Sequence, residues 1–334
     1  MVTSVGGSAM AKAAREDPEL RKYSLEGFAL GSGETLPAGA VLAYRVYGAG
    51  PKVAVAGTSY GVAHTALKWH YGRTIDESFT FVAFNLMGNG VSFSPSTCPE
   101  GYDYPAVVDV RDNVRAQKKA LDADPDLRGR TIDLVFGFSM GAMQAFEWAR
   151  AYPECVEVAA PICGSSGCED YNKVFLEGLV AILEAPTPTA DKLKTFGAVY
   201  AGWYVGPDFY RLQHWTQKGF TSLQDWLDNF AQKRWNLGDP DDFLAMVKTW
   251  RHTAPFSEDD MKAITHTKVL ILPCDADTYF RVEAIADREL KHIPNATMKV
   301  IPSSWGHLAG NPESLPDEFH VIKSNLDLVL SKAP

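Results

Sequence analysis

Short apolar runs alternate with amphipathic stretches along the first half of the chain. The runs are rich in β-branched residues and predict strands, whereas apolar positions near 3.6-residue spacing predict helices between them. The expected strands cover residues 41–47, 52–56, 79–85, 132–138 and 156–162, and the expected helices cover residues 104–122 and 142–152. Because strands and helices alternate, we predict an α/β fold with a mostly parallel central sheet and helices on both faces.

The alternation stops between residues 164 and 255, where the pattern is helical and rich in aromatic residues. It then resumes, with expected strands over residues 268–272 and 298–301 and expected helices over residues 280–290 and 316–330. We therefore expect a core domain of residues 26–163 and 256–334, with residues 164–255 inserted as a helical lid. Residues 1–25 lack the apolar segment of a signal peptide and are expected to form a loose tail.

A Gly-x-Ser-x-Gly motif, from Gly137 to Gly141, lies where an expected strand passes directly into an expected helix. A serine on such a sharp turn is held in a strained conformation, with its hydroxyl exposed above the edge of the sheet. The two glycines fit a place where strand and helix backbones approach too closely for a Cβ. This context separates the motif from a chance match in a loop, and it predicts Ser139 as a catalytic nucleophile.

A serine nucleophile needs a base, and the base needs a third group that orients it. In this architecture the serine is followed along the chain by an acid after a late strand and then by a histidine after the last strand. Asp275 and Asp277 both follow the strand expected over residues 268–272, so both are candidates for the acid. His307 follows the last expected strand, directly after a glycine, and we predict it as the base.

The negative charge that develops in acyl transfer must be stabilised by N–H donors that are already in place. One donor is expected from the backbone of Met140, the residue after the nucleophile. The second is expected from the loop after the strand over residues 52–56, where Ser59 or Tyr60 is suitably placed and Ser59 is preferred.

The aromatic residues of the expected lid allow two interpretations, and both can hold. They can form the small core of the insert itself, or they can line an apolar pocket above Ser139. The candidate substrate-binding residues are Tyr60, Trp203, Tyr204 and Trp215.

The composition narrows the functions that such a site can serve. With 32 Lys and Arg against 41 Asp and Glu, the net charge is −9, so neither nucleic acid nor a membrane surface is an expected partner. No apolar stretch reaches the length of about 18 residues that a spanning helix requires. The five cysteines have neither a disulfide framework nor metal-binding spacing, which favours reduced thiols in the cytoplasm and no metal or other cofactor.

Together these residues resemble the homoserine O-acetyltransferase-like branch of the α/β-hydrolase family. The resemblance spans most of the chain, from about residue 41 to residue 330, and is carried by residues 85–96, 112–117, 137–148, 277–280 and 306–307. The segment over residues 137–148 is long and specific, whereas the acid segment is weaker. The resemblance implies an acyl-enzyme mechanism in which Asp277 is the triad acid and Asp275 is its neighbour.

Two departures from this branch concern the substrate. An aspartate that helps to hold the substrate amine usually follows the catalytic histidine there, but Leu308 follows His307 in this chain. The substrate-binding arginine expected in the insert is also not evident, and Arg234 lies nearest to its place. Since an ammonium group without its carboxylate is costly in a buried site, we expect a substrate other than homoserine.

The sequence therefore predicts a serine hydrolase that acts on an ester, thioester or other acyl group of a small, fairly apolar metabolite. Two alternatives stay open. One is transfer of an acyl group, for example from acyl-CoA, to an alcohol other than homoserine. The other is a receptor that binds a ligand on this fold without turnover. A homodimer also stays open as the assembly.

Overall fold

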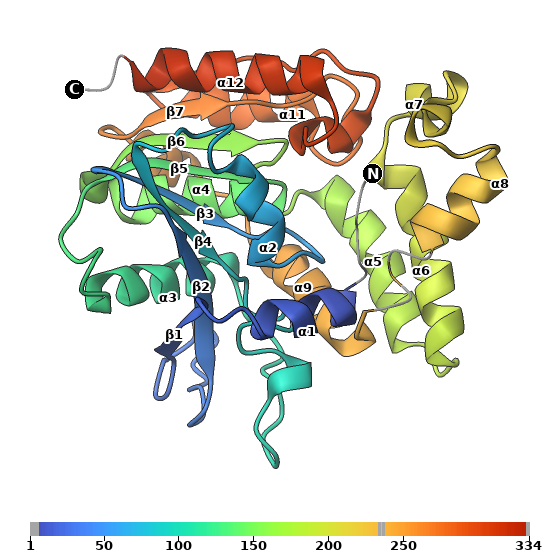
Figure 1. The fold of residues 1–334 in the computed structure, drawn as a ribbon, viewed down its shortest axis with the longest axis horizontal. Coiled ribbons are helices and arrows are strands. Elements are labelled where there is room, and N and C mark those ends of the chain that lie inside the picture. The colour runs from blue at the N-terminus through green and yellow to red at the C-terminus, as the bar shows by residue number, and fades with distance from the viewer. Residues whose placement is uncertain (1–6, 233–234, 236–237, 332–334) are drawn as a thin grey trace.

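Eight strands form one sheet in the computed structural model, which describes residues 7–232, 235 and 238–331 (Figure 1). The strands are β1 (Arg21–Ser24), β2 (Val41–Tyr47), β3 (Lys52–Gly57), β4 (Phe79–Phe84), β5 (Ile132–Phe138), β6 (Val156–Ile162), β7 (Lys268–Ile271) and β8 (Ala296–Met298). Their order across the sheet is β1-β2-β4-β3-β5-β6-β7-β8. The pairs β1–β2 and β2–β4 are antiparallel and all other neighbours are parallel, which confirms the predicted fold class.

This strand order creates a switch point between β3 and β5. From β3 the chain moves to β4 on one side, and it then crosses to β5 on the other side of β3. Ligands of open α/β sheets bind beyond the carboxyl ends of the strands at such a point. The loops that follow β3 and β5 carry Ser59 and Ser139, so the fold brings these two residues to the same edge.

Each of the four helices expected outside the insert is present, although three of them begin at another residue than expected. They are α1 (Gly7–Arg15), α2 (His64–Leu67), η1 (Lys68–His70), η2 (Pro95–Thr97), α3 (Val110–Ala123), α4 (Met140–Ala151), η3 (Pro153–Cys155), α5 (Asp170–Glu184), α6 (Thr189–Tyr204), α7 (Pro207–Arg211), η4 (His214–Lys218), α8 (Leu223–Trp226), η5 (Leu227–Gln232), α9 (Pro240–His252), α10 (Glu258–Lys262), α11 (Val282–Ile285), η6 (Ala286–Leu290), η7 (Gly306–Gly310) and α12 (Pro316–Leu330). The helix expected over residues 104–122 begins only at α3, because Asp109 caps it by accepting a hydrogen bond from the N–H of Arg111.

Alternate residues of β5 point into the two layers that cover the sheet. Leu134 and Phe136 belong to the apolar cluster that also contains Ile322 of α12, whereas Val135 belongs to the cluster of α3 and α4 that contains Trp148. All five side chains are almost completely buried. Because side chains of a strand alternate between faces, the apolar run from Leu134 to Phe138 fits a strand covered on both sides.

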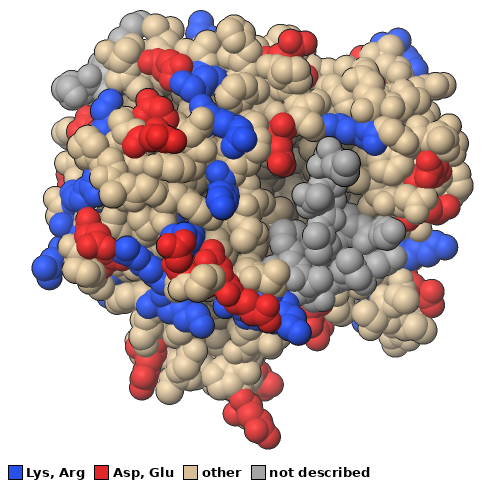
Figure 2. Space-filling model, viewed as in Figure 1, with Lys and Arg blue, Asp and Glu red and all other residues tan. Residues whose placement is uncertain are grey.

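The helices α5 to α9, which we call the lid helices, lie between β6 and β7 in the chain and together on one side of the molecule (Figure 1). Aromatic rings form much of their interior: Trp226 stacks on Phe230 with ring centroids 4.3 Å apart, and Phe196 stacks on Phe243 at 5.9 Å. Among residues 7–232 and 238–331, no helix combines the length and the apolar character that crossing a membrane requires. On the face shown in Figure 2, acidic and basic side chains are interspersed.

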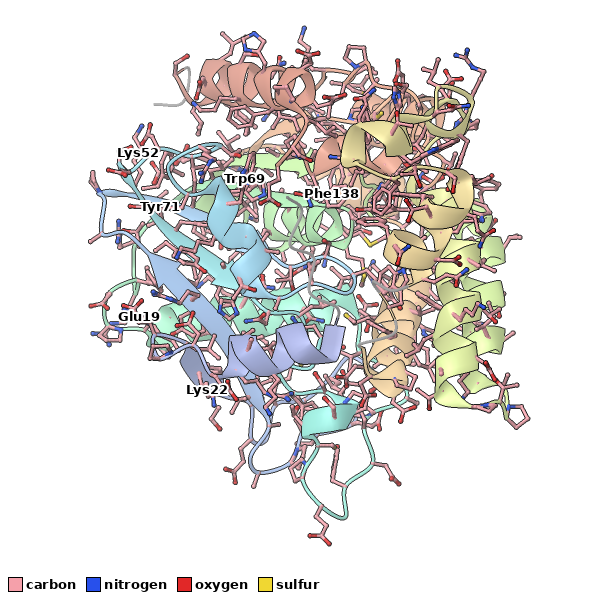
Figure 3. The ribbon with its side chains drawn as sticks, turned by 45° about the vertical axis from the view of Figure 1, so that its right-hand side comes forward. Glu19, Lys22, Lys52, Trp69, Tyr71 and Phe138 are labelled. Atoms are coloured by element: carbon pink, nitrogen blue, oxygen red, sulfur yellow. The ribbon has the colours of Figure 1, made fainter. Side chains whose placement is uncertain are left out.

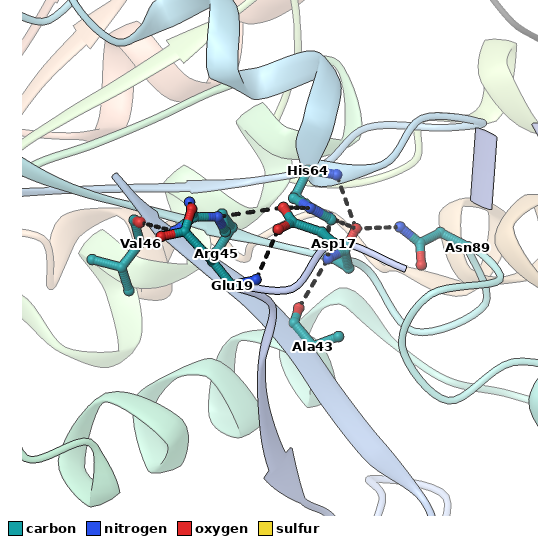
Figure 4. A network of polar contacts seen from close by, with 8 residues as sticks. Asp17, Glu19, Ala43, Arg45, Val46, His64 and Asn89 are labelled. Carbon is teal, nitrogen blue, oxygen red and sulfur yellow. Dashed lines mark hydrogen bonds and ion pairs between the residues drawn. The ribbon is translucent and has the colours of Figure 1, made fainter. Parts of the chain in front are cut away.

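The N-terminal segment, expected to be a loose tail, is instead attached to the sheet from residue 15 onward. Strand β1 pairs with β2, and Asp17 holds Arg45 of β2 and the buried His64, with contacts of 3.3 and 3.2 Å to its Oδ2 (Figure 4). Arg45 also pairs with Glu19. Asp17 and Glu19 therefore serve as partners for Arg45 on β2, and Asp17 also contacts His64 of α2.

Candidate active site

Ser139 occupies the turn between β5 and α4 in a conformation that few residues other than glycine adopt, with φ 58° and ψ −121°. The turn is this tight because the two backbones nearly touch. A Cβ added to Gly137 would lie 2.2 Å from the carbonyl oxygen of Gly141, and one added to Gly141 would lie 2.7 Å from that of Gly57. The geometry has the features of a nucleophile elbow, in which strain holds the serine hydroxyl at the carboxyl edge of the sheet.

His307 and Asp277 form a buried hydrogen-bonded pair, with 2.8 Å between His307 Nδ1 and Asp277 Oδ2. The other carboxylate oxygen, Oδ1, accepts hydrogen bonds from the backbone N–H groups of Tyr279 at 2.8 Å and Phe280 at 3.3 Å. These bonds fix the carboxylate, and the carboxylate in turn fixes the imidazole. An acid held in this way favours the histidine tautomer that has its proton on Nδ1 and leaves Nε2 free to act as a base.

The other acidic candidate, Asp275, has a different position. Its Oδ1 accepts a hydrogen bond of 2.9 Å from the backbone N–H of Ser303, and its own N–H donates to the carbonyl oxygen of Ile301. Asp275 therefore joins the loop after β7 to the loop that leads to His307. The structure separates two residues that the sequence pattern alone left equivalent.

The ring of His307 is also held by its packing. Phe138, the residue before the nucleophile, lies with its ring centroid 4.5 Å from that of His307, and Tyr279 meets the imidazole edge-on at 4.7 Å. The preceding Gly306 has φ 63°, and a Cβ there would lie 2.1 Å from the backbone nitrogen of Gly206 in the lid. Among the described residues no hydrogen bond joins Ser139 Oγ to His307; such bonds often tighten only when substrate binds.

The two expected oxyanion donors belong to the first turn of α4 and to the loop after β3. The N–H of Met140 is the first of helix α4, where the helix dipole favours negative charge, and Ser59 lines the same cavity as Ser139. Within the part of the chain that the structure describes, neither backbone N–H donates to another group. Both are therefore available to a ligand.

Gln144 supports this arrangement and was not singled out from the sequence. Its Nε2 donates to the carbonyl oxygens of Thr58 at 2.9 Å and Met140 at 3.1 Å, so it ties the loop after β3 to the first turn of α4. Its Oε1 accepts from Gln117 at 2.7 Å, and Gln117 accepts from Trp148 at 2.8 Å. A glutamine four residues after Met140, in a stretch of α4 that is otherwise apolar from Met140 to Phe146, is the signal that could have identified it.

A cavity of about 50 Å³ lies beside Ser139 and His307. Of the residues expected to bind substrate, Tyr60 and Tyr204 line it, together with Tyr200 and Trp235, which were not predicted. The hydroxyl of Tyr60 donates to the carbonyl oxygen of Phe243 at 3.2 Å, and burial raises the pKa of this phenol well above its usual value. Tyr60 therefore stays neutral and presents an aromatic surface to the cavity.

Trp203 and Trp215 do not reach this cavity. Trp203 stacks parallel to Tyr279, with centroids 6.1 Å apart, and packs against Phe175 at 4.6 Å, so it supports the wall from behind. Trp215 lies in a separate aromatic group of the lid with Phe209. Both belong to the lid interior, which is the structural interpretation of the aromatic residues.

The two departures from homoserine O-acetyltransferases can be compared with the structure only in part. Leu308 is nearly buried and packs in the apolar cluster of α12, so no carboxylate occupies the position after His307. Arg234 lies outside the described residues. Among the described residues, no group of three or more His, Cys, Asp or Glu side chains is arranged to hold a metal ion.

Comparisons with known proteins bear on the family and the fold. A family model described as "Alpha/beta hydrolase family" matches residues 48–320. The chain is 32% identical to an ethyl acetate hydrolase of Pseudomonas veronii over 259 residues, which cover 71% of this chain and 72% of that protein. It is 37% identical to a homoserine O-acetyltransferase of Zymomonas mobilis over 124 residues, covering 34% of this chain and 32% of that protein.

Among solved structures, the acetyl esterase MekB superposes with a TM-score of 0.85 at 26% identity, covering 93% of this chain and 96% of that chain. An acetylester hydrolase from Corynebacterium glutamicum superposes with a TM-score of 0.86, covering 98% of this chain and 100% of that one. At 23% identity, the second likeness shows the fold alone.

Proposed function

The chain belongs to the alpha/beta hydrolase family, and we propose that within this family it is a serine esterase that hydrolyses short-chain esters. The observation that carries the proposal is the buried His307–Asp277 pair, because His307 lines one small cavity together with the strained Ser139. The similarity to an ethyl acetate hydrolase over more than two thirds of both chains supports the same reaction class.

The proposed reaction proceeds through an acyl-enzyme. Ser139 Oγ attacks the ester carbonyl carbon while His307 Nε2 accepts the hydroxyl proton, and the resulting oxyanion is bound by the N–H groups of Met140 and Ser59. As the intermediate collapses, the C–O bond to the alcohol breaks and His307 returns the proton to the leaving oxygen. Water, deprotonated by His307, then attacks the acyl carbon and releases the carboxylic acid and free Ser139.

The size of the cavity supports a short acyl or alcohol group. Its volume of about 50 Å³ is a third of the roughly 150 Å³ of an engineered cavity that binds benzene. Aromatic side chains close it on the lid side, and burying an alkyl group there contributes about 0.8 kcal/mol per CH₂. A long acyl chain would require the lid helices to move.

Acyl transfer to an alcohol is the second candidate, because the same residues would form the same acyl-enzyme. The observation that favours it is the 37% identity to a homoserine O-acetyltransferase over about a third of the chain. Leu308 in place of the amine-binding carboxylate argues against homoserine as the acceptor. An enzyme that acetylates homoserine from acetyl-CoA faster than it hydrolyses ethyl acetate would overturn the esterase assignment.

The test uses release of acid from ethyl acetate in a pH-stat and labelling of the protein with an alkyl fluorophosphonate. We expect hydrolysis and one label per chain, both lost in Ser139→Ala and both kept in Ser324→Ala, which removes an exposed hydroxyl on α12. Labelling without turnover of any ester or thioester would instead indicate a ligand receptor. A label that persists in Ser139→Ala would show that another residue is the nucleophile.

A further inference from the structure

A buried histidine that the proposed mechanism does not use lines the catalytic cavity. His70 ends the short helix η1 and is only 6% exposed. Its Nδ1 lies 2.8 Å from Oγ1 of Thr74, one turn further along the chain. Within residues 7–232 and 238–331, no group bonds to the other ring nitrogen, Nε2.

The ring of His70 has little freedom to turn toward another partner. Phe136 meets it edge-on with centroids 5.2 Å apart, and Trp69 does so on another side, also at 5.2 Å. Trp69 is itself packed edge-on against Phe319 of α12 at 5.4 Å. Figure 3 shows Trp69 on the short helical segment beside the sheet and Phe138 where β5 passes into α4. The aromatic packing and the Thr74 contact together fix which nitrogen is left for the cavity.

The electrostatic state of His70 suits recognition of an uncharged group. Burial lowers the pKa of its imidazole to about 4, so the ring is neutral at neutral pH. A neutral imidazole has one N–H donor and one acceptor nitrogen, and Thr74 already engages one of the two. A ligand that covers the second nitrogen without bonding to it would remove that nitrogen from water, which costs free energy, whereas a ligand that bonds to it avoids this cost.

A second polar side chain lines the cavity from the segment that carries His307. Asn311 follows helix η7 (Gly306–Gly310) directly and is half-buried. Its backbone N–H donates to the carbonyl oxygen of Leu308, which holds the residue in place, and no described group bonds to its side-chain amide. In the proposed reaction His307 returns its proton to the leaving alcohol. The alcohol oxygen of the ester therefore lies against His307, which is four residues before Asn311 in the same segment.

We propose that His70 and Asn311 form a polar subsite for the alcohol part of the substrate, so that the preferred substrates are short esters of diols or of glycerol. The second, uncharged oxygen of such an alcohol would bond to His70 Nε2 and the Asn311 amide, while the acyl group lies against Ser139. This inference rests on the proposed esterase function and specifies its substrate class. A plain alkyl ester would leave both polar groups without a partner.

The kinetic test compares 2-hydroxyethyl acetate with ethyl acetate, which differ by one hydroxyl group. In the wild-type protein we expect kcat/KM to be higher for the hydroxylated ester. One net hydrogen bond to the substrate changes kcat/KM by about tenfold. The ratio of kcat/KM for 2-hydroxyethyl acetate to that for ethyl acetate should therefore fall about tenfold in His70→Phe and similarly in Asn311→Leu. His320→Phe, which changes an exposed histidine of α12, should leave the ratio unchanged.

Two outcomes would overturn the subsite. One is a ratio that is the same in wild type and both variants. The other is an equal loss on both esters, which would assign His70 a structural role in the turn to Thr74. Asn311→Leu keeps the test decisive if His70→Phe does not fold, since the side-chain amide of Asn311 bonds to no described residue.

A binding measurement separates failure of the subsite from failure of the esterase proposal. The nitrogen chemical shifts of His70 are followed by NMR in Ser139→Ala while 2-hydroxyethyl acetate or ethyl acetate is added. A shift of Nε2 with the hydroxylated ester alone supports the subsite even if the wild-type protein hydrolyses no ester. Turnover of both esters without such a shift would leave the esterase proposal standing and remove the subsite.

Discussion

Replacing Asp277 by asparagine tests the site more sharply than deleting a side chain, because the geometry predicts which way the new amide must point. Oδ1 of Asp277 accepts the backbone N–H of Tyr279 at 2.8 Å, and an amide NH₂ cannot accept there. The amide oxygen of the variant therefore stays in that position. Its NH₂ group then faces Nδ1 of His307, which lies 2.8 Å from Oδ2 in the wild-type protein.

This orientation forces the wrong tautomer on the histidine. An NH₂ donor at Nδ1 requires a lone pair there, so the ring proton moves to Nε2, where the base needs a lone pair. The corresponding change in a Ser-His-Asp enzyme lowers kcat by about 10⁴. At about 1.36 kcal/mol per tenfold, this is a barrier increase of about 5.5 kcal/mol. We expect a loss of this size in Asp277→Asn while the fold is kept.

Asp275→Asn is the matched control. Its oxygen can still accept the N–H of Ser303, so kcat/KM should stay within about threefold of wild type. The assay is acid release from ethyl acetate at pH 7.5, with thermal unfolding to show that both variants fold. An Asp277→Asn protein that keeps more than a tenth of the wild-type rate, or equal losses in the two variants, would refute the tautomer argument.

The remaining predictions concern the elbow and the lid. Gly137→Ala should unfold at a markedly lower temperature than wild type or fail to fold, since its Cβ would lie 2.2 Å from a backbone oxygen. Gly178→Ala, in open space on helix α5, should instead raise the free energy of unfolding by about 1 kcal/mol, measured by thermal unfolding. Burial raises the pKa of Asp242, which joins α9 to Ser96, to about 6 from 3.8. The folded state therefore favours the protonated form, so this group's contribution to stability is greatest at low pH and is lost as pH rises through about 6. As pH rises from 4.5 to 7.5, the free energy of unfolding of Asp242→Asn, measured with denaturant, should increase by about 2 kcal/mol relative to that of the wild type. A difference between the two proteins that is independent of pH would contradict this.

The strands around the candidate site could be predicted almost residue by residue, and the physical reason is burial. After one acidic residue near its start, each of β5 and β6 is apolar because helices cover both of its faces, so the runs over residues 132–138 and 156–162 match the observed bounds. The strand expected over residues 298–301 is less buried and lies instead at β8, with Ile301 making only an isolated bridge to Cys274. Where one face of a strand is open, the sequence pattern constrains its register less.

The order of residues along the chain does not determine whether Asp275 or Asp277 contacts the histidine. Both residues follow β7 within a short turn, and both accept hydrogen bonds from backbone N–H groups. What distinguishes them is the direction in which each side chain leaves the turn, which depends on backbone angles that composition does not encode. The resemblance to a known family favoured Asp277, and the contact with His307 gives that preference a physical basis.

The sequence itself explains why Tyr204 lines the cavity whereas Trp203, another candidate on the same helix, does not. Trp203 was predicted to bind substrate because the expected lid is rich in tryptophan. The positions on α6 that face inward, however, repeat at intervals of three and four residues: Leu193, Phe196, Gly197, Tyr200, Ala201 and Tyr204. This stripe places Tyr200 and Tyr204 one turn apart on the cavity wall, and it leaves Trp203 on the neighbouring face against Phe175. Gly197 belongs to the same stripe because a Cβ there would lie 2.6 Å from the carbonyl oxygen of Ala231, so η5 can pack directly on α6. Helix phase, and not the size of an aromatic side chain, therefore decides which lid residues can meet a substrate.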